Sequence, residues 1–144
     1  MIIRIDQTSN TPIYLQIRNQ IVEGIAREEL VSGDGLPSIR QLAADLGINL
    51  HTANKAYAVL RDEGYVVMRG RKGAFIADAR AVDSPERQAA DDERLAAELH
   101  RLALECRARG GSQARFVELA CKQAKRAFAD SPSPDPRNFP DRLS

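Results

Sequence analysis

Two short amphipathic segments flank a glycine in residues 36–60, LPSIRQLAADLGINLHTANKAYAVL. Ser38, with Gln41 three residues later, is typical of a capping box that begins a helix. Gly47 predicts the end of this helix, because glycine readily adopts the left-handed conformation of a C-terminal cap. The apolar face between these signals consists of Ile39, Leu42, Ala43 and Leu46. Residues 38–46 therefore predict a short helix with one buried face.

A second helix is expected directly after this turn, from an N-cap at Asn49 to about Glu63. Its inward face, at spacings of three and four, consists of Ala53, Ala56, Tyr57 and Leu60. The opposite face carries His51, Lys55 and Asp62. Two helices joined by a short turn that contains glycine form a helix-turn-helix pattern, in which the second helix presents its N-terminal residues to the major groove of DNA.

Two strand-like runs follow a helix stop at Gly64, namely residues 65–68 (YVVM) and 74–77 (AFIA). The residues between them, RGRKG at 69–73, combine three cations with two glycines. The pattern predicts a hairpin with a flexible, strongly basic tip. Such a hairpin after a helix-turn-helix is a wing, which contacts the DNA backbone or the minor groove.

The residues before the helix-turn-helix predict two further elements. Residues 2–5, IIRI, read as a short strand. A helix is expected next, with Thr11 as its N-cap and Pro12 in its first helical position. Its buried stripe consists of Ile13, Ile17, Ile21 and Ile25. Residues 1–78 thus predict a mainly α winged helix-turn-helix DNA-binding domain with a small β-hairpin.

The order of these motifs closely resembles the N-terminal domain of GntR-family transcription regulators over residues 8–78. The matching runs are 12–17, 36–43, 46–49, 56–57, Leu60, 63–64 and 73–76. The PIYLQI run at 12–17 and residues 49–57 look most like the YtrA subfamily. The resemblance implies a homodimeric DNA-binding regulator without enzymatic activity, acting as a repressor of its own operon and of neighbouring transporter genes.

The resemblance also implies which residues contact DNA. Arg40 would bind a phosphate, assisted by a helix N-terminus. Contacts from the recognition helix are expected at Asn49, Leu50, His51, Thr52, Asn54 and Lys55. Contacts from the wing are expected at Arg69, Arg71, Lys72 and Gly73. The chain departs from many family members in two places, since Leu50 stands where they have Arg or Pro, and His51 where they have Asn or Thr.

Residues 79–128 predict a helical dimerisation segment. Ser84 and Ser112 are the expected N-caps of two helices, and Gly110 ends the first of them. The apolar stripes consist of Leu95, Leu99, Leu102 and Cys106, and of Phe116, Leu119, Ala120, Ala124 and Phe128. Two helices cannot enclose a core alone, so we expect a homodimer with a shared helical bundle. A twofold dimer in turn implies a pseudo-palindromic operator.

The composition sets wider limits. The chain has 144 residues, of which 43% are apolar, and 21 Lys and Arg nearly balance 20 Asp and Glu. Residues 1–78 also sum to zero, with nine cations and nine acids. Five of these cations lie on the predicted DNA face, namely Arg40, Lys55, Arg69, Arg71 and Lys72. The positive charge is therefore concentrated on this face, while residues 1–78 as a whole are neutral. This argues against strong non-specific DNA binding. Residues 129–144 hold four of the seven prolines and predict a disordered tail.

Cysteine usage and hydropathy predict the compartment and the cofactors. Two cysteines, no leader-like start and no run of about 20 apolar residues favour a cytoplasmic protein without membrane contact. The GRKG run at 70–73 lacks the spacing of a phosphate-binding loop, which argues against a nucleotide site. No cofactor and no metal are expected. The arginines of the second segment alternate with acids, which favours a solvated surface over RNA or membrane contact.

Two alternatives remain open besides the DNA-binding regulator. A winged-helix protein-interaction module without DNA binding is supported by Leu50 and by the near-zero charge. A metal- or redox-responsive regulator would use His100, Cys106 and Cys121 as soft ligands, but free cysteines are commonly small buried hydrophobes. A small-molecule effector would have to bind between the domains or at the dimer interface.

Overall fold

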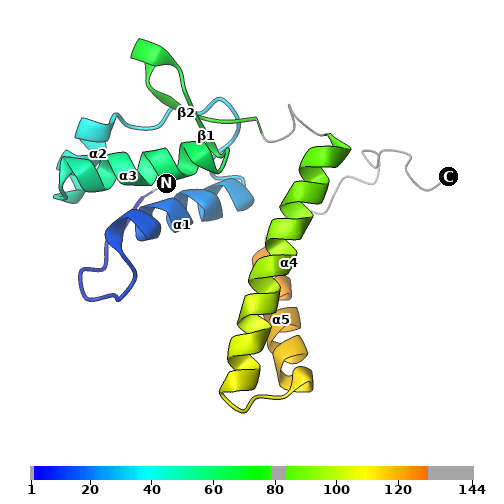
Figure 1. The fold of residues 1–144 in the computed structure, drawn as a ribbon. Coiled ribbons are helices and arrows are strands. Elements are labelled where there is room, and N and C mark those ends of the chain that lie inside the picture. Colours follow the sequence, from blue (N-terminus) through cyan, green and yellow to red (C-terminus); the bar gives the residue numbers. More distant parts are fainter. Residues whose placement is uncertain (1, 79–83, 130–144) are drawn as a thin grey trace. The chain divides into compact units, whose positions relative to one another are not determined.

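The computed structural model describes residues 2–78 and 84–129, which fall in two compact units, Met1–Val82 and Asp83–Ser144. The elements of the first unit are α1 (Ile13–Ala26), α2 (Ile39–Leu46), α3 (Leu50–Asp62), β1 (Val66–Met68), the 3-10 turn η1 (Gly70–Lys72) and β2 (Ala74–Ile76) (Figure 1). Those of the second unit are α4 (Pro85–Ala108) and α5 (Gln113–Phe128). The predicted fold class, mainly α with a small hairpin and two following helices, is confirmed. The predicted tail lies outside the described residues from residue 130 onward.

The helix-turn-helix forms at the capping residues that the sequence predicts. Ser38 Oγ accepts a hydrogen bond from the Gln41 backbone N–H at 3.1 Å, and Asn49 Oδ1 accepts one from the N–H two residues on at 2.8 Å. Gly47 ends α2 in the left-handed conformation, with φ 64° and ψ 36°. The Gln41 side chain does not complete a capping box, because it donates to Asp45 Oδ1 at 2.6 Å instead.

The wing is a two-stranded antiparallel sheet in which Val66 pairs with Ile76, Val67 with Phe75 and Met68 with Ala74. The segment that leads into α2 lies along the free edge of β2. Gly35 forms an isolated bridge with Phe75, and the Leu36 N–H donates to the Ala74 carbonyl at 2.9 Å. These bonds tie the start of the helix-turn-helix to the wing.

The prediction of a strand at residues 2–5 is wrong. The backbone of this segment pairs with glutamine side chains of α1 and not with another strand. The Arg4 N–H donates to Gln20 Oε1 at 2.9 Å, and Gln20 Nε2 donates to the Arg4 carbonyl at 2.6 Å. Gln16 makes the same exchange with Asp6, at 2.9 and 3.0 Å. The two amides thus satisfy backbone groups that a neighbouring strand would otherwise have to satisfy.

Three element boundaries also differ from the prediction by one residue. Thr11 is not the N-cap of α1, because Pro12 occupies that position without a side-chain cap. The Thr11 carbonyl accepts a hydrogen bond from Gln16 Nε2 at 2.8 Å. Tyr65 and Ala77 lie just outside the two strands, although the Ala77 N–H still donates to the Tyr65 carbonyl at 2.9 Å.

The hydrophobic core lies in the first unit. It joins α1, α2, α3 and the wing, and its buried members are Ile17, Ile21, Leu42, Ala43, Ala53, Ala56, Tyr57, Leu60, Val66, Ala74 and Ile76. Ile13 and Ile25, at the two ends of the predicted α1 stripe, are half-buried against this cluster. The first unit therefore encloses an apolar core of its own.

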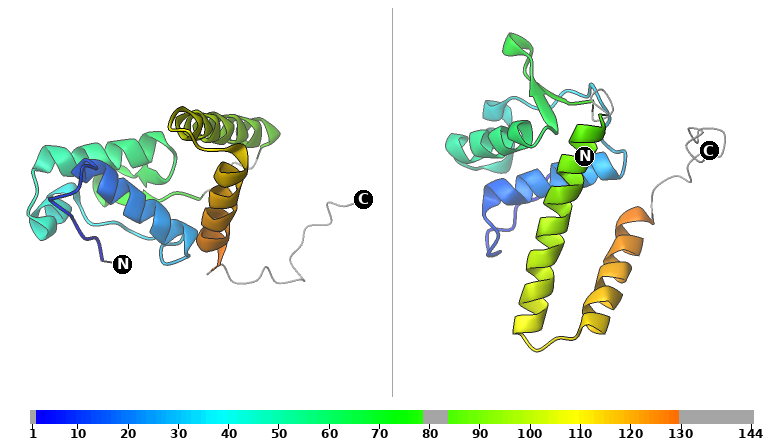
Figure 2. Two further views of the ribbon diagram at one scale, coloured as in Figure 1. Left: turned by 90° about the horizontal axis from the view of Figure 1, so that it is seen from below. Right: turned by 45° about the vertical axis from the view of Figure 1, so that its right-hand side comes forward.

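The described part of the second unit is a helical hairpin, and neither α4 nor α5 contains a buried residue. Ser84 and Ser112 cap its helices as predicted, and Gly110 lies in the connection with φ 84°. Figure 2 shows α4 and α5 joined at this turn and spreading apart from it. Among the described residues, no helix combines the length and the apolar character that crossing a membrane requires.

Candidate nucleic-acid interface

The N-terminal half of α3 presents the residues expected to contact DNA. Leu50, His51, Asn54 and Lys55 are exposed, and Thr52 is half-buried. The four exposed residues lie at positions i, i+1, i+4 and i+5, so they share one face of the helix. The other face is anchored by Ala53, Ala56, Tyr57 and Leu60. The apolar face thus fixes α3 in the core and leaves its polar face open.

Asn49 and Arg40 occupy the starts of the two helices. Asn49 is exposed, but its side-chain oxygen already accepts the hydrogen bond that caps α3. Arg40 lies in the first turn of α2, is exposed, and has no carboxylate partner among the described residues. A free guanidinium beside helical N–H groups is suited to bind a phosphate.

Tyr57 holds the start of α2 in place relative to α3. Its hydroxyl donates a hydrogen bond to the Pro37 carbonyl at 2.6 Å, two residues before α2 begins. Burial raises the pKa of Tyr57 to about 12, because the core disfavours the phenolate. The side chain therefore stays a neutral donor, and the contact fixes the segment from which Arg40 projects.

The tip of the wing forms a single 3-10 turn, η1. The Lys72 N–H donates to the Arg69 carbonyl at 2.9 Å, and the Arg69 N–H donates to the Gly73 carbonyl at 2.9 Å. Gly73 has φ 101°, a conformation that other residues rarely adopt. Arg71 and Lys72 are exposed on the turn, and the Arg69 guanidinium carbon lies 5.6 Å from the centroid of the Phe75 ring.

Sequence reasoning missed Tyr14, which contacts one of the predicted DNA-binding residues. The Lys55 ammonium lies 4.1 Å from the centroid of the Tyr14 ring, a cation–π distance. Tyr14 belongs to the PIYLQI run at 12–17, which carries part of the family resemblance. That run does not reveal the contact, because Lys55 is distant in the sequence.

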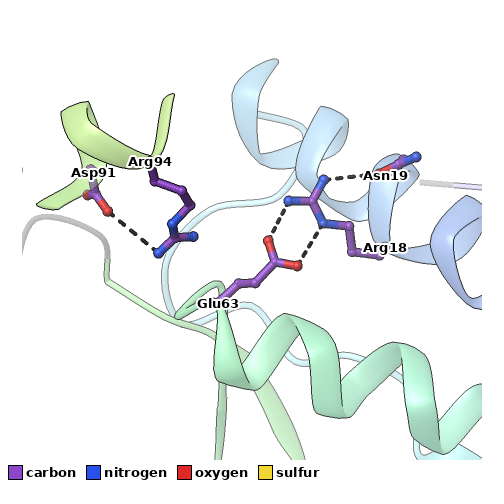
Figure 3. Close-up of polar contacts among 5 residues, drawn as sticks. All are labelled: Arg18, Asn19, Glu63, Asp91 and Arg94. Carbon is purple, nitrogen blue, oxygen red and sulfur yellow. Dashed lines mark hydrogen bonds and ion pairs between the residues drawn. The ribbon is translucent and has the colours of Figure 1, made fainter. Parts of the chain in front are cut away.

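An ion pair fastens α1 to the far end of α3 (Figure 3). Arg18 Nε donates to Glu63 Oε1 at 3.2 Å, and Arg18 Nη2 donates to the other carboxylate oxygen. The hydrogen bond with Glu63 raises the pKa of Arg18 above its ordinary value. Arg18 Nη1 also donates to Asn19 Oδ1 at 3.0 Å. The Arg18 guanidinium therefore serves to stabilise the packing of α1 against the end of α3.

The predicted dimerisation residues are exposed or half-buried. Their larger members are Leu95, Leu99, Leu102, Phe116, Leu119 and Phe128. His100 and Cys106 line a half-open cavity of about 380 Å³ between α4 and α5, while Cys121 is not among its lining residues. The described parts of the chain contain no group of three or more His, Cys, Asp or Glu side chains that could hold a metal ion.

The fold and the exposed face of α3 define a winged helix-turn-helix DNA-binding protein. Residues 13–76 match the family of bacterial regulatory proteins known as the gntR family. The HTH-type transcriptional regulator Rv1152 of Mycobacterium tuberculosis is 33% identical over 90 residues, which cover 62% of this chain and 74% of that protein. The chain therefore belongs to the GntR family of DNA-binding transcription regulators.

Two further proteins are similar to this chain. The HTH-type transcriptional repressor YtrA of Bacillus subtilis is 43% identical over 77 residues, or 53% of this chain. The match spans 58% of YtrA, less than two thirds of its length. The crystal structure of a transcriptional antiterminator from Listeria monocytogenes EGD-e superposes with a TM-score of 0.72 at 27% identity, covering 89% of this chain and 93% of that one. The YtrA-like resemblance of the sequence is thus confirmed.

Proposed function

We propose that the chain is a homodimeric transcriptional repressor that binds a pseudo-palindromic operator. The main observation in support of DNA binding is the exposed polar face at the N-terminal half of α3, whose opposite face is buried in the core. The similarity to a protein named as a repressor supports the direction of regulation. In this arrangement α3 enters the major groove and reads base edges there.

The proposed DNA contacts divide by their chemistry. Arg40 binds a phosphate at the start of α2, while His51, Asn54 and Lys55 reach base edges or phosphates from α3. The wing binds backbone or minor groove through Arg69, Arg71, Lys72 and the close approach of Gly73. The remaining contacts from the start of α3 come from Asn49, Leu50 and Thr52. Phosphate contacts position the domain, and base contacts supply the sequence preference.

The proposed dimer forms through the helical hairpin. Leucines are exposed on α4, Leu119 and Phe128 are exposed on α5, and neither helix has a buried residue. A surface that a second copy covers would have this apolar character. The residues assigned to this interface are Leu95, Leu99, Leu102, Cys106, Phe116, Leu119 and Phe128. Twofold symmetry then places two copies of α3 on half-sites separated by about 10 base pairs or a multiple of that distance.

A titration of DNA from upstream of the protein's own gene tests this proposal. The full chain is added to the labelled fragment at several salt concentrations, with a scrambled fragment for comparison. We expect preferential binding of the upstream DNA, and the double variant R71A/K72A should lower the salt slope by about 1.8, since each lost phosphate contact accounts for about 0.9. The control K122A/K125A removes two exposed lysines from α5 and should leave the slope unchanged.

Two outcomes of this titration would contradict the proposal. A folded wild-type chain that fails to prefer the upstream DNA would favour the protein-interaction module without DNA binding. A salt slope unaffected by R71A/K72A would remove the wing from the interface.

A further inference from the structure

We propose that Tyr14 is a positioning residue for DNA binding, because its ring holds the Lys55 ammonium at the face of α3 where a DNA phosphate is bound. The inference rests on the proposed function and assigns a role to a residue of α1. The affinity for DNA then depends in part on a contact between α1 and α3.

The geometry places the two side chains as such a pair requires. Lys55 is exposed on the second turn of α3, and its Nζ lies 4.1 Å from the Tyr14 ring centroid. A cation within about 6 Å of a ring centroid is attracted by the negative face of the ring. Tyr14 is half-buried in the first turn of α1 and packs against the core cluster. The ring is therefore a fixed platform, whereas the lysine is a long side chain in solvent.

The charge of Lys55 remains available to an anion. Within residues 2–78 and 84–129, Lys55 forms no ion pair with a carboxylate, in contrast to Arg18, which is paired with Glu63. A ring contact differs from an ion pair in this respect, because it leaves the charge unneutralised. The ammonium can therefore keep the ring on one side and donate N–H groups to a phosphate on another.

The expected benefit is a smaller entropic cost of binding. A free lysine loses much rotamer freedom when it is immobilised at an interface. The Tyr14 ring already restricts Lys55 before DNA arrives, so less freedom is lost on binding. The interaction free energy of a cation–π pair at an exposed site corresponds to about a two- to fivefold change in affinity.

A double-mutant cycle on operator affinity tests the inference, using Tyr14→Leu, Lys55→Ala and the combination of both in the full chain. We expect Tyr14→Leu to weaken binding about two- to fivefold in the wild-type background and to have no further effect when Lys55 is already alanine. Tyr14→Phe is the matched control, since it keeps the ring and removes only the hydroxyl. It should bind DNA like the wild type.

Three outcomes would overturn the assignment. Additive effects of Tyr14→Leu and Lys55→Ala would show that the two side chains act independently. A loss in Tyr14→Phe as large as that in Tyr14→Leu would mean that the hydroxyl itself contacts DNA. A Tyr14→Leu effect that tracks a fall in the unfolding temperature would assign the ring to stability alone.

An NMR measurement keeps the test valid if Tyr14→Leu does not fold. The Lys55 methylene protons nearest the ammonium should be shifted upfield by the ring current in both the wild type and Tyr14→Phe, before and after DNA is added. Unshifted protons would overturn the proposal.

The two proposals fail separately, because operator binding that is sensitive to R71A/K72A but shows no coupling in the cycle contradicts only the role of Tyr14. A wild type that does not bind the operator contradicts both.

Discussion

The two units of this chain carry similar apolar stripes but bury them to different extents. The first unit surrounds Ile17, Ile21 and Leu60 so completely that each is at most 1% exposed. In the second unit Leu95 is 60% exposed and Phe128 is 74% exposed, and no residue of α4 or α5 is buried. Three helices and a wing can surround a core, whereas two helices cannot. Helical periodicity alone therefore does not tell whether a stripe is covered by its own chain or by another.

Within the part of the chain that the structure describes, both units contain cations paired with carboxylates, but the cations of the proposed DNA face are not among them. On α4, Arg101 pairs with Glu98 at 3.0 Å and with Glu105 at 2.7 Å, and Arg94 lies 3.9 Å from Asp91 (Figure 3). These are exposed pairs within one helix, which contribute little to stability. In the first unit, Arg40 and the cations of η1 have no such pairing among the described residues. A nearly neutral chain thus keeps unneutralised charge where the proposed DNA contact lies.

The largest expected effect comes from breaking the closed core. Leu60→Ala should lower the free energy of unfolding of the first unit by about 2–5 kcal/mol, because it leaves a cavity at a fully buried position. Urea unfolding followed by tyrosine fluorescence measures this, since all three tyrosines lie in residues 14–65 and the chain has no tryptophan. Leu95→Ala is the matched control and should change this free energy by less than about 0.5 kcal/mol. Equal losses in the two variants would abolish the contrast between the units.

The next effect concerns the surface that the second unit leaves uncovered. The double variant L99K/L102K should raise the dissociation constant of the proposed dimer about 100-fold or more, because it replaces apolar contacts with charges. Sedimentation equilibrium measures the change, and tyrosine fluorescence checks that the first unit stays folded. Val31→Lys alters an apolar residue of the first unit that is 52% exposed, and it should leave association unchanged. A wild type that is monomeric at micromolar concentration would contradict the prediction.

The smallest effect tests the contact between α3 and the segment before α2. Tyr57→Phe should destabilise the first unit by about 1 kcal/mol at neutral pH, because the Pro37 carbonyl loses its donor. The pKa of Tyr57 in the folded chain, about 12, lies above its ordinary value of 10.0. The stability that accompanies this raised pKa is fully present below pH 10 and is lost as the pH rises toward 12, since the unfolded chain releases the proton first. Urea midpoints at pH 8 and pH 11 should therefore differ more for the wild type than for Tyr57→Phe, and equal differences would argue against this assignment.

Much of the first unit could be predicted because its signals are local. Ser38, Gly47 and Asn49 each act within a few residues, and each caps the helix that the sequence assigns to it. The failures involve residues whose partners are distant in the chain. In the segment 2–5, expected to be a strand, the backbone of Arg4 pairs with the Gln20 side chain, and the adjacent Asp6 pairs with Gln16. The spacing of the apolar residues could not distinguish these amides from a neighbouring strand.

One further feature of the fold conflicts with its local sequence. Glu28 adopts a φ of 59° directly after α1, a conformation in which glycine is the usual residue. Neither composition nor periodicity indicates a left-handed residue at a glutamate. The Leu30 N–H donates to the Gly24 carbonyl at 3.0 Å across this turn, so the hydrogen bonds at the end of the helix accompany the unusual conformation.

The sequence by itself determined the order of the helices, their caps, the hairpin and the family, because apolar spacing and capping residues act over one or two helical turns. Only the tertiary structure decided that Gly35 joins the wing and that Tyr14 meets Lys55. These features depend on which surfaces meet in space. Contacts between residues far apart in the chain leave no periodic trace in the sequence.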